Sequence, residues 1–285
     1  MRRSLLFMPG NNPAMLQNSD VFEADAVIYD LEDAVSVTEK DSARKLVAEF
    51  LRFNKSLPME VVIRINGLDT DFYSSDLEYV VSDRIDTIML PKADHDGLLQ
   101  LDKLLTKIEQ EKGLTKKIKV IPIIELAKSV LEIEKIVTCP RVDGVLLGAE
   151  DLSSDLDVIR TKKGDEILYA RQRLVMACSA YKIDSIDTPF TDTNDNDGLK
   201  TDCEFAVSIG FTSKSAIHPN QVTTINKTFV PTKEKIEWAL RVEAANAEAL
   251  KKGLGVFSLD GKMVDKPVIE RANKILKKAK AYKLI

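Results

Sequence analysis

The sequence predicts an α/β protein built on a (β/α)8 TIM barrel, with a C-terminal appendage of helices and a hairpin. Eight short apolar runs alternate with segments of helical periodicity, which is the pattern of repeated strand and helix units. Most runs are continuously apolar, as expected of strands covered on both faces. The polar residues gather at the C-terminal end of each run, and in a barrel these ends meet at one rim. An open doubly wound sheet is the alternative.

The predicted strands follow one another from the N-terminus to about residue 220. They cover residues 4–10, 25–33, 61–67, 86–92, 119–125, 143–151, 184–190 and 213–219. Between them, segments such as 42–53 and 98–111 place apolar residues at helical spacing, with charged residues on the other side. The repeat stops near residue 230, so we predict a TIM-barrel catalytic domain over residues 1–230.

The remaining residues, 231–285, are predicted to form the C-terminal appendage. A helix pattern over 231–253 ends at Gly253, a residue suited to terminating a helix. Asp260 and Gly261 are a typical hairpin pair, and a last helix begins behind Pro267. We expect this segment to act as a lid that packs on the barrel or, more specifically, on a neighbouring subunit.

Composition and charge exclude several classes of protein. The chain has 285 residues, of which 44% are hydrophobic and 30% charged, and its net charge of -4 does not indicate a nucleic-acid surface. Apolar runs are too short to cross a membrane. The run near the N-terminus is also shorter than that of a signal peptide, so we expect a cytoplasmic protein. Three scattered cysteines indicate neither a disulfide framework nor a zinc site.

Two carboxylates at neighbouring strand ends are the strongest candidates for chemistry. Glu125 ends the run 119–125, and Asp151 ends the run 143–151. Hard carboxylate oxygens in a pair suit Mg²⁺, which takes one or two protein carboxylates and leaves other positions to water and substrate. The alternative is that each caps a helix or pairs with a nearby cation.

The run 25–33 adds Asp30, Glu32 and Asp33, either as acids that orient metal-bound water or, for Asp33, as a helix cap. Arg64 and Lys92 are expected to be buried strand-end cations that need anionic partners, supplied either by substrate or by these acids. His218, just before a proline, is best interpreted as a hydrogen-bonded structural residue. No serine-hydrolase, Walker or dinucleotide motif is present in the sequence.

Several motifs taken together resemble one known family. These are RRSLLFMPGNNPAML, DAVIYDLEDAV, EKDSARKLV, VIRIN, LPKAD, GAEDL and GLGVFSLDGKMVDKPVIERA. In this order they resemble citrate lyase beta subunits, within the CitE-like and HpcH/HpaI aldolase superfamily. The resemblance implies a Mg²⁺-dependent lyase that cleaves a 3-hydroxy-acyl thioester, such as citryl-acyl-carrier protein or citryl-coenzyme A, to an acetyl thioester and oxaloacetate.

The resemblance also assigns roles to individual residues. Glu125 and Asp151 match the family's metal ligands, with Glu125 also at the substrate, and Arg64 matches its substrate-binding arginine. Asp33 matches an acid behind the metal site. Asp265 matches a catalytic acid that the C-terminal segment presents to a neighbour's active site.

Three basic residues, Arg3, Lys40 and Arg44, match the region that meets the pantetheine and phosphate end of the thioester. The implied partners are an acyl-carrier protein or a coenzyme A thioester, the alpha and gamma subunits of citrate lyase, and further copies of the chain in a homo-oligomer. His218 departs from the family pattern, because citrate lyase beta chains often have asparagine there. A stand-alone malyl- or citramalyl-coenzyme A lyase is therefore the alternative, and a non-catalytic thioester-binding barrel is a third.

Overall fold

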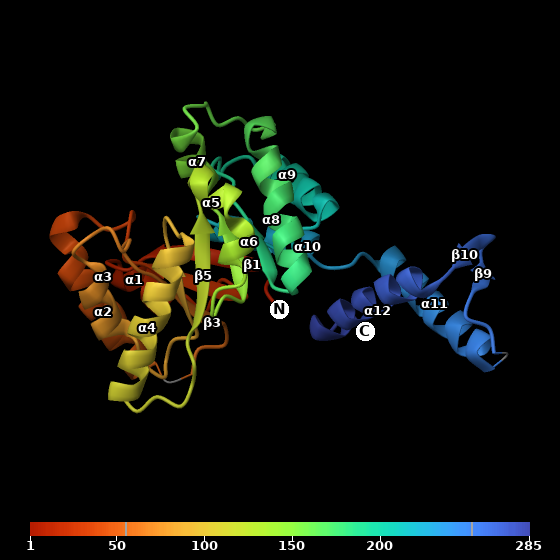
Figure 1. The fold of residues 1–285 in the computed structure, drawn as a ribbon, viewed down its shortest axis with the longest axis horizontal. Coiled ribbons are helices and arrows are strands. Elements are labelled where there is room, and N and C mark those ends of the chain that lie inside the picture. Colours follow the sequence, from red (N-terminus) through yellow and green to blue (C-terminus); the bar gives the residue numbers. More distant parts are fainter. Residues whose placement is uncertain (55, 252) are drawn as a thin grey trace. The chain divides into compact units, whose positions relative to one another are not determined.

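A computed structural model describes residues 1–54, 56–251 and 253–285. The chain divides into two compact units, Arg2–Asn226 and Lys227–Ile285. Figure 1 shows the elements of each unit.

The first unit is a closed barrel of parallel strands, as predicted. In the described part of the unit the strands are β1 (Ser4–Pro9), β2 (Ala26–Asp30), β3 (Glu60–Arg64), β4 (Thr87–Leu90), β5 (Lys119–Ile124), β6 (Gly144–Leu147), β7 (Asp184–Asp187) and β8 (Ser213–Ala216). Each strand pairs with the next, and β8 pairs with β1 through Leu5 and Ser215. This last pairing closes the sheet and rules out the open doubly wound alternative.

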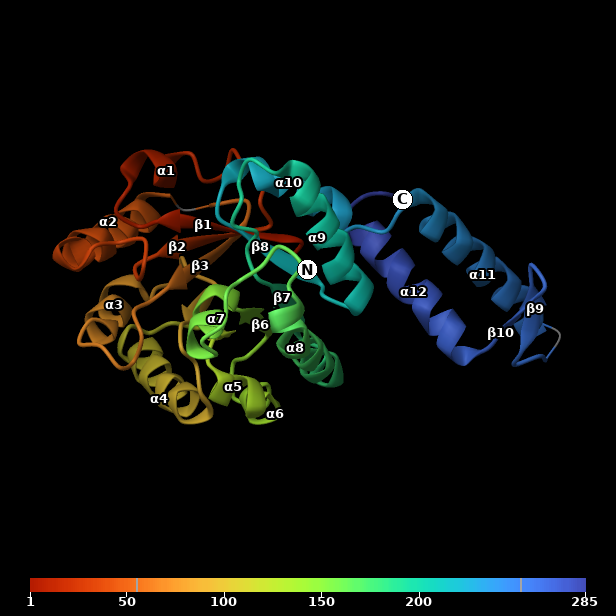
Figure 2. The same ribbon diagram turned by 90° about the horizontal axis from the view of Figure 1, so that it is seen from above.

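Helices surround the strands, as seen from above in Figure 2. They are α1 (Pro13–Gln17), α2 (Lys40–Phe53), α3 (Tyr73–Val80), α4 (His95–Glu111), α5 (Ala127–Leu131), α6 (Ile133–Ile136), α7 (Ala149–Asp155), α8 (Leu168–Tyr181), α9 (Asn196–Ile209) and α10 (Val222–Thr228). Two of the longer helices begin with the same device. Asp94 and Asp195 each accept a hydrogen bond from the N–H of a glycine three residues later, which satisfies a donor that the first helical turn leaves open.

The barrel contains a buried apolar cluster and, at the N-terminal end of its strands, a network of ion pairs. Leu5, Ala26, Ile28, Val62, Met89, Ile121, Ile123, Leu146 and Ile186 form one buried apolar cluster. At the N-terminal end of the strands, the guanidinium of Arg2 pairs with Glu60, Asp143 and Asp184, which come from three different strand regions. This end is filled by a structural ion network, and the candidate site lies at the other end.

The second unit contains the helices and the hairpin expected from the sequence. Helix α11 (Lys233–Lys251) and helix α12 (Lys266–Ala281) lie side by side, and β9 (Phe257–Leu259) and β10 (Lys262–Val264) form an antiparallel pair. Asp260 and Gly261, at the turn, have φ of 51° and 73°, as a type I′ hairpin turn requires.

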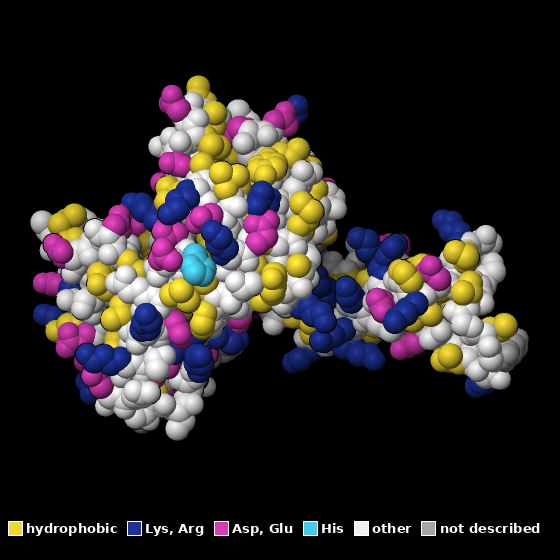
Figure 3. Space-filling view, viewed as in Figure 1, with side chains coloured by type: hydrophobic (Ala, Val, Ile, Leu, Met, Phe, Trp, Pro, Cys, Tyr) yellow, Lys and Arg dark blue, Asp and Glu magenta, His cyan; other side chains and the backbone are white. Residues whose placement is uncertain are grey.

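Charge is distributed unevenly in the second unit. Lys and Arg side chains gather over α12 in Figure 3, and the helix buries Ala272, Leu276 and Ala279 on its opposite side.

Among the described residues, no helix is long and apolar enough to cross a membrane. The three cysteines are buried and free.

Candidate functional site

A cavity of about 410 Å³ opens at the C-terminal end of the barrel. Its walls come from residues at or just after the ends of β1, β2, β3, β5, β6, β7 and β8, so segments distant in sequence share one space. Arg64, Glu125, Asp151 and Asp33, which were singled out from the sequence, all line it. The apolar part of the wall includes Phe7, Met8, Pro9, Ile123, Leu146, Pro189 and Ile217.

Glu125 is a buried acid at the floor of this cavity. Its side chain is 3% exposed, and one carboxylate oxygen accepts a hydrogen bond of 2.5 Å from the backbone N–H of Lys92. Burial raises the pKa of Glu125 to about 7; the N–H of Lys92 opposes this rise, and the carboxylate of Asp151 adds to it. A buried acid beside a second acid is costly unless a cation binds them, so the pair favours a metal ion.

Arg64 is fixed by acids from the end of β2. Its Nε and Nη2 donate to the two oxygens of Asp30 at 2.7 and 2.6 Å, and its Nη1 lies 3.0 Å from Glu32. The guanidinium carbon also lies 5.0 Å from the centre of the Phe7 ring. Arg64 was expected to pair either with substrate or with the nearby acids. In the structure it pairs with the acids.

Asp30 and Glu32 form the rest of this acidic turn. Asp30 also accepts from the N–H of Glu32 at 2.9 Å and from the N–H of Ala34 at 3.0 Å, which fixes the turn beside the cavity. Burial raises the pKa of Glu32 to about 8; Arg64 lowers it, and the nearby acids Asp33, Glu125 and Asp30 raise it. The site therefore concentrates negative charge around one arginine.

Asp33 and Asp151 are exposed acids of the cavity wall, as is Glu150. Asp33 is 71% exposed and lies 3.6 Å from Nη1 of Arg64. It caps no helix, because α2 begins only at Lys40, so the helix-cap alternative is wrong. Asp151 lies in the first turn of α7, directly behind β6.

Lys40 and Arg44, which were expected to contact the thioester, instead bind groups of the protein itself, so those two expectations are corrected. The ammonium of Lys40 donates to the backbone carbonyls of Leu31 and Glu32 at 2.8 and 2.6 Å. Arg44 is 3% exposed and donates to buried Asp76 at 2.8 Å. Since both cations are buried and hydrogen-bonded to groups of the protein, neither presents its charge to a phosphate. Lys40 supports the acidic turn instead.

Arg3 and Lys92 also differ from expectation. Arg3 precedes β1, at the end of the barrel opposite the cavity, and its guanidinium pairs with Asp25 at 2.7 Å, so the expected contact with substrate is corrected. The Lys92 side chain is 51% exposed, and its ammonium is 3.9 Å from Asp69; it is not a buried cation. Sequence reasoning missed the contribution of its backbone N–H to Glu125.

His218 and Asp265 both take part in helix capping. The Nδ1 of His218 accepts from the N–H of Asn220, and Gln221 completes a capping box, which confirms the structural interpretation of this histidine. Asp265 lies in the second unit, where it accepts from the N–H of Val268 at 3.3 Å as the N-cap of α12.

The donor set of the cavity fits Mg²⁺. Glu125 and Asp151 offer hard oxygen ligands from adjacent strand ends. In the part of the chain that the structure describes, no group of three or more acidic, histidine or cysteine side chains is arranged to hold a metal ion. A pair of carboxylates is the number that Mg²⁺ commonly takes from a protein, whereas zinc needs three or four ligands.

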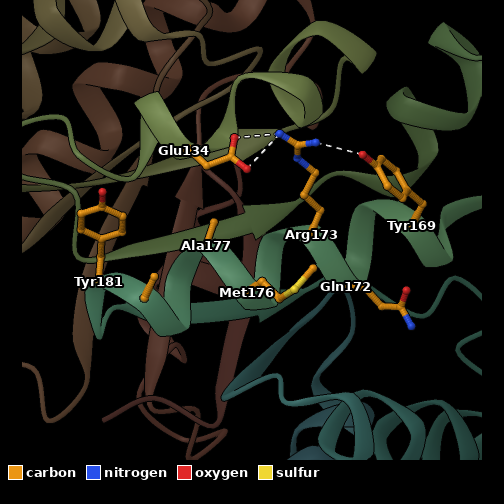
Figure 4. A pocket seen from close by; sticks show the side chains of 8 residues that line it. Glu134, Tyr169, Gln172, Arg173, Met176, Ala177 and Tyr181 are labelled. Atoms are coloured by element: carbon orange, nitrogen blue, oxygen red, sulfur yellow. Dashed lines mark hydrogen bonds and ion pairs between the residues drawn. The ribbon is translucent and has the colours of Figure 1, made fainter.

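Another hollow, of about 420 Å³, lies on the surface of α6 and α8 (Figure 4). Its central cation, Arg173, is already bound to Glu134 at 2.8 Å and to the hydroxyl of Tyr169 at 2.9 Å. No carboxylate pair faces this hollow among its lining residues. The barrel cavity is therefore the candidate active site.

Comparisons with known proteins agree with the motifs. The family model for HpcH/HpaI aldolase/citrate lyase matches residues 3–219. The chain is 41% identical to citrate lyase subunit beta of Leuconostoc mesenteroides subsp. cremoris, over 100% of this chain and 95% of that one. It is 32% identical to the mitochondrial citramalyl-CoA lyase of Rattus norvegicus, over 99% and 87%.

A solved structure supports the same relationship. CitE from Mycobacterium tuberculosis, in complex with magnesium, acetoacetate and coenzyme A, aligns with a TM-score of 0.79 at 29% identity, over 97% of each chain. The expected fold and the resemblance to citrate lyase beta subunits are both confirmed.

Proposed function

Since this chain belongs to the HpcH/HpaI aldolase/citrate lyase family, we propose that it cleaves a 3-hydroxy-acyl thioester with the help of Mg²⁺. It is a carbon–carbon lyase by family, and the substrate we propose is a citryl group on an acyl-carrier protein or on coenzyme A. The products would be an acetyl thioester and oxaloacetate. The observation that carries this proposal is the carboxylate pair Glu125 and Asp151 in one cavity with Arg64.

The reaction needs charge stabilisation at two places. The substrate's 3-hydroxyl must lose its proton as it becomes a ketone, and the departing carbon must become an enolate. Glu125 and Asp151 would hold the metal ion, which when bound supplies Lewis-acid stabilisation at the hydroxyl and its neighbouring carboxylate.

Arg64 is the proposed donor to the enolate oxygen. A donor that is already oriented needs no reorganisation as negative charge develops. The two hydrogen bonds to Asp30 hold the plane of the guanidinium, and the third nitrogen, Nη1, lies 3.0 Å from Glu32 and 3.6 Å from Asp33, which lines the cavity. Asp33 is proposed to orient water or substrate beside this nitrogen.

The enolate carbon finally needs a proton from an acid. We propose Asp265, supplied by a neighbouring copy in a homo-oligomer, on the basis of the family resemblance. An interaction with alpha and gamma subunits, and a cytoplasmic location, are further parts of the proposal.

A stand-alone coenzyme A lyase acting on malyl or citramalyl thioesters is the second candidate. It is supported by the 32% identity to a citramalyl-CoA lyase and by 31% identity to an L-malyl-CoA/beta-methylmalyl-CoA lyase of Cereibacter sphaeroides. His218, the departure from the citrate lyase pattern, has a helix-capping contact and so does not distinguish the two.

The test is an assay of the purified protein with Mg²⁺ against citryl-, malyl- and citramalyl-coenzyme A and against carrier-bound citrate, following release of the keto acid. Oxaloacetate from citryl thioesters supports the first candidate. Activity on malyl- or citramalyl-coenzyme A alone supports the second. If no substrate yields a keto acid while the folded protein is present, the lyase proposal fails and a thioester-binding barrel replaces it.

A further inference from the structure

Glu125 is surrounded by the ends of the two strands that flank β5. Strand β4 leads into Lys92 on one side, and β6 leads into Gly148 on the other. Backbone hydrogen bonds tie both ends to β5, from the N–H of Ala93 to the carbonyl of Ile123 and from the N–H of Gly148 to the carbonyl of Ile124. The surroundings of Glu125 are thus built from backbone that the barrel itself holds.

On the β4 side, the backbone of Lys92 adopts a left-handed conformation, with φ of 45°. This conformation is uncommon for a residue with a side chain and persists where the surroundings enforce it. Here it accompanies the 2.5 Å hydrogen bond from the N–H of Lys92 to Oε1 of Glu125. The Lys92 side chain is 51% exposed and its ammonium lies 3.9 Å from Asp69, so the backbone is the part of Lys92 that contacts Glu125.

On the β6 side, Gly148 leaves room for the same carboxylate. Its φ and ψ of -91° and 85° are open to other residues, so its backbone does not demand glycine. Space does. A Cβ at this position would lie 2.6 Å from Oε2 of Glu125, 2.8 Å from its Cβ and 2.9 Å from Cγ2 of Ile123. Two of these atoms lie close to the backbone of β5, so bending the tip of Glu125 away would not relieve the overlap.

We propose that Lys92 and Gly148 are positioning residues for the metal ligand Glu125: the N–H of Lys92 orients one carboxylate oxygen, and the missing side chain at Gly148 leaves the space in which the other oxygen lies. The inference rests on the proposed Mg²⁺-dependent function. Groups that orient a metal ligand affect the affinity for the metal even though they do not touch it, typically by ten- to a hundredfold.

The experiment compares Gly148→Ala with Gly255→Ala, a matched glycine control at which an added Cβ meets no atom within 4 Å. Titration calorimetry measures the Mg²⁺ dissociation constant, and urea unfolding without Mg²⁺ measures stability. We expect Mg²⁺ to bind Gly148→Ala at least about tenfold more weakly, and the control to bind as the wild type does. Wild-type affinity in Gly148→Ala, whether or not its stability falls, would overturn the inference while leaving the proposed function intact.

A wild-type protein that binds no Mg²⁺ would instead overturn the proposed function, and this inference with it. A second measurement covers the case in which Gly148→Ala does not fold. In Glu125→Ala the N–H of Lys92 loses its acceptor, so its amide should exchange with deuterium at least about tenfold faster, whereas the amide of Ala93, bonded to Ile123, should not change. Unchanged exchange at Lys92 would refute the positioning contact.

Discussion

Replacing Lys214 with methionine should lower the stability of the barrel substantially. Lys214 points outward from β8 and is fully buried, and its ammonium donates to Asp187, Asp202 and the carbonyl of Thr188, each at 2.6 Å. Arg171 pairs with the same two carboxylates, at 2.9 and 2.8 Å. The four side chains join β7 and β8 to helices α8 and α9.

The size of the effect follows from this geometry. Breaking a buried ion pair by removing one partner costs about 3–5 kcal/mol, because the other charge stays buried. In Lys214→Met, Arg171 still pairs with both carboxylates and offsets one of their two negative charges, so we expect the lower end, about 3 kcal/mol. For a protein of this size that corresponds to a fall in Tm of roughly 6–12 °C.

Urea unfolding and scanning calorimetry provide the assay. Lys107→Met is the control, because Lys107 is 72% exposed and its loss should change stability by less than about 0.5 kcal/mol. In the double variant Lys214→Met with Asp202→Asn, the loss should be smaller than the sum of the single losses, since the unpaired charge is gone. A loss below about 1 kcal/mol in Lys214→Met would refute the reasoning.

The same network makes a prediction about pH. The nearby cations Lys214 and Arg171 hold the pKa of Asp202 below its ordinary value against the opposing effect of burial. A carboxyl with a lowered folded pKa stabilises the protein fully above its unfolded pKa, and this contribution is lost as pH falls through the folded pKa. In Lys214→Met the folded pKa of Asp202 should rise, so acid unfolding should begin at a higher pH than in the wild type.

Three further predictions concern the proposed chemistry. Glu125→Gln or Asp151→Asn should keep the fold and lose most Mg²⁺ binding and turnover; unchanged affinity in calorimetry would contradict the metal site. Arg64→Lys keeps the charge but loses the planar fork, so turnover should fall beyond any change in Tm; a normal rate with a lowered Tm would mean a structural role. Asp265→Asn should retain the α12 cap, whereas Asp265→Ala should cost about 1 kcal/mol. If Asp265 acts in a neighbour's site, mixing inactive Asp265→Asn and Glu125→Gln chains should restore activity once subunit exchange is verified, and no recovery would refute sharing.

The barrel and the main acids of the site could be predicted because their signals are local. A continuous apolar run identifies a strand, and the residue at its end is identified with it, so Glu125 and Asp151 could be placed at one rim without knowing any contact. The pair Asp260 and Gly261 predicts the hairpin in the same way, because these residue types by themselves favour the positive φ angles that the turn requires.

The pairing of the cations was decided by tertiary structure. Sequence reasoning treated Arg3, Lys40 and Arg44 as one basic region, yet they meet different partners at different depths. Arg44 pairs with Asp41 in the same helix and also with buried Asp76, 32 residues away, which only the fold brings to it. Which charges meet depends on how segments distant in the chain pack, and a buried cation is occupied wherever packing brings it an acceptor.

Sequence alone therefore determined the strand and helix repeat, the family and the acids at the strand ends, since each depends on neighbouring residues. Only the folded barrel decided that Gly148 must lack a side chain and that the backbone of Lys92 faces Glu125, because both facts concern atoms that belong to different strands. A close approach between strands depends on the register and curvature of the closed sheet, and no short stretch of sequence encodes that distance.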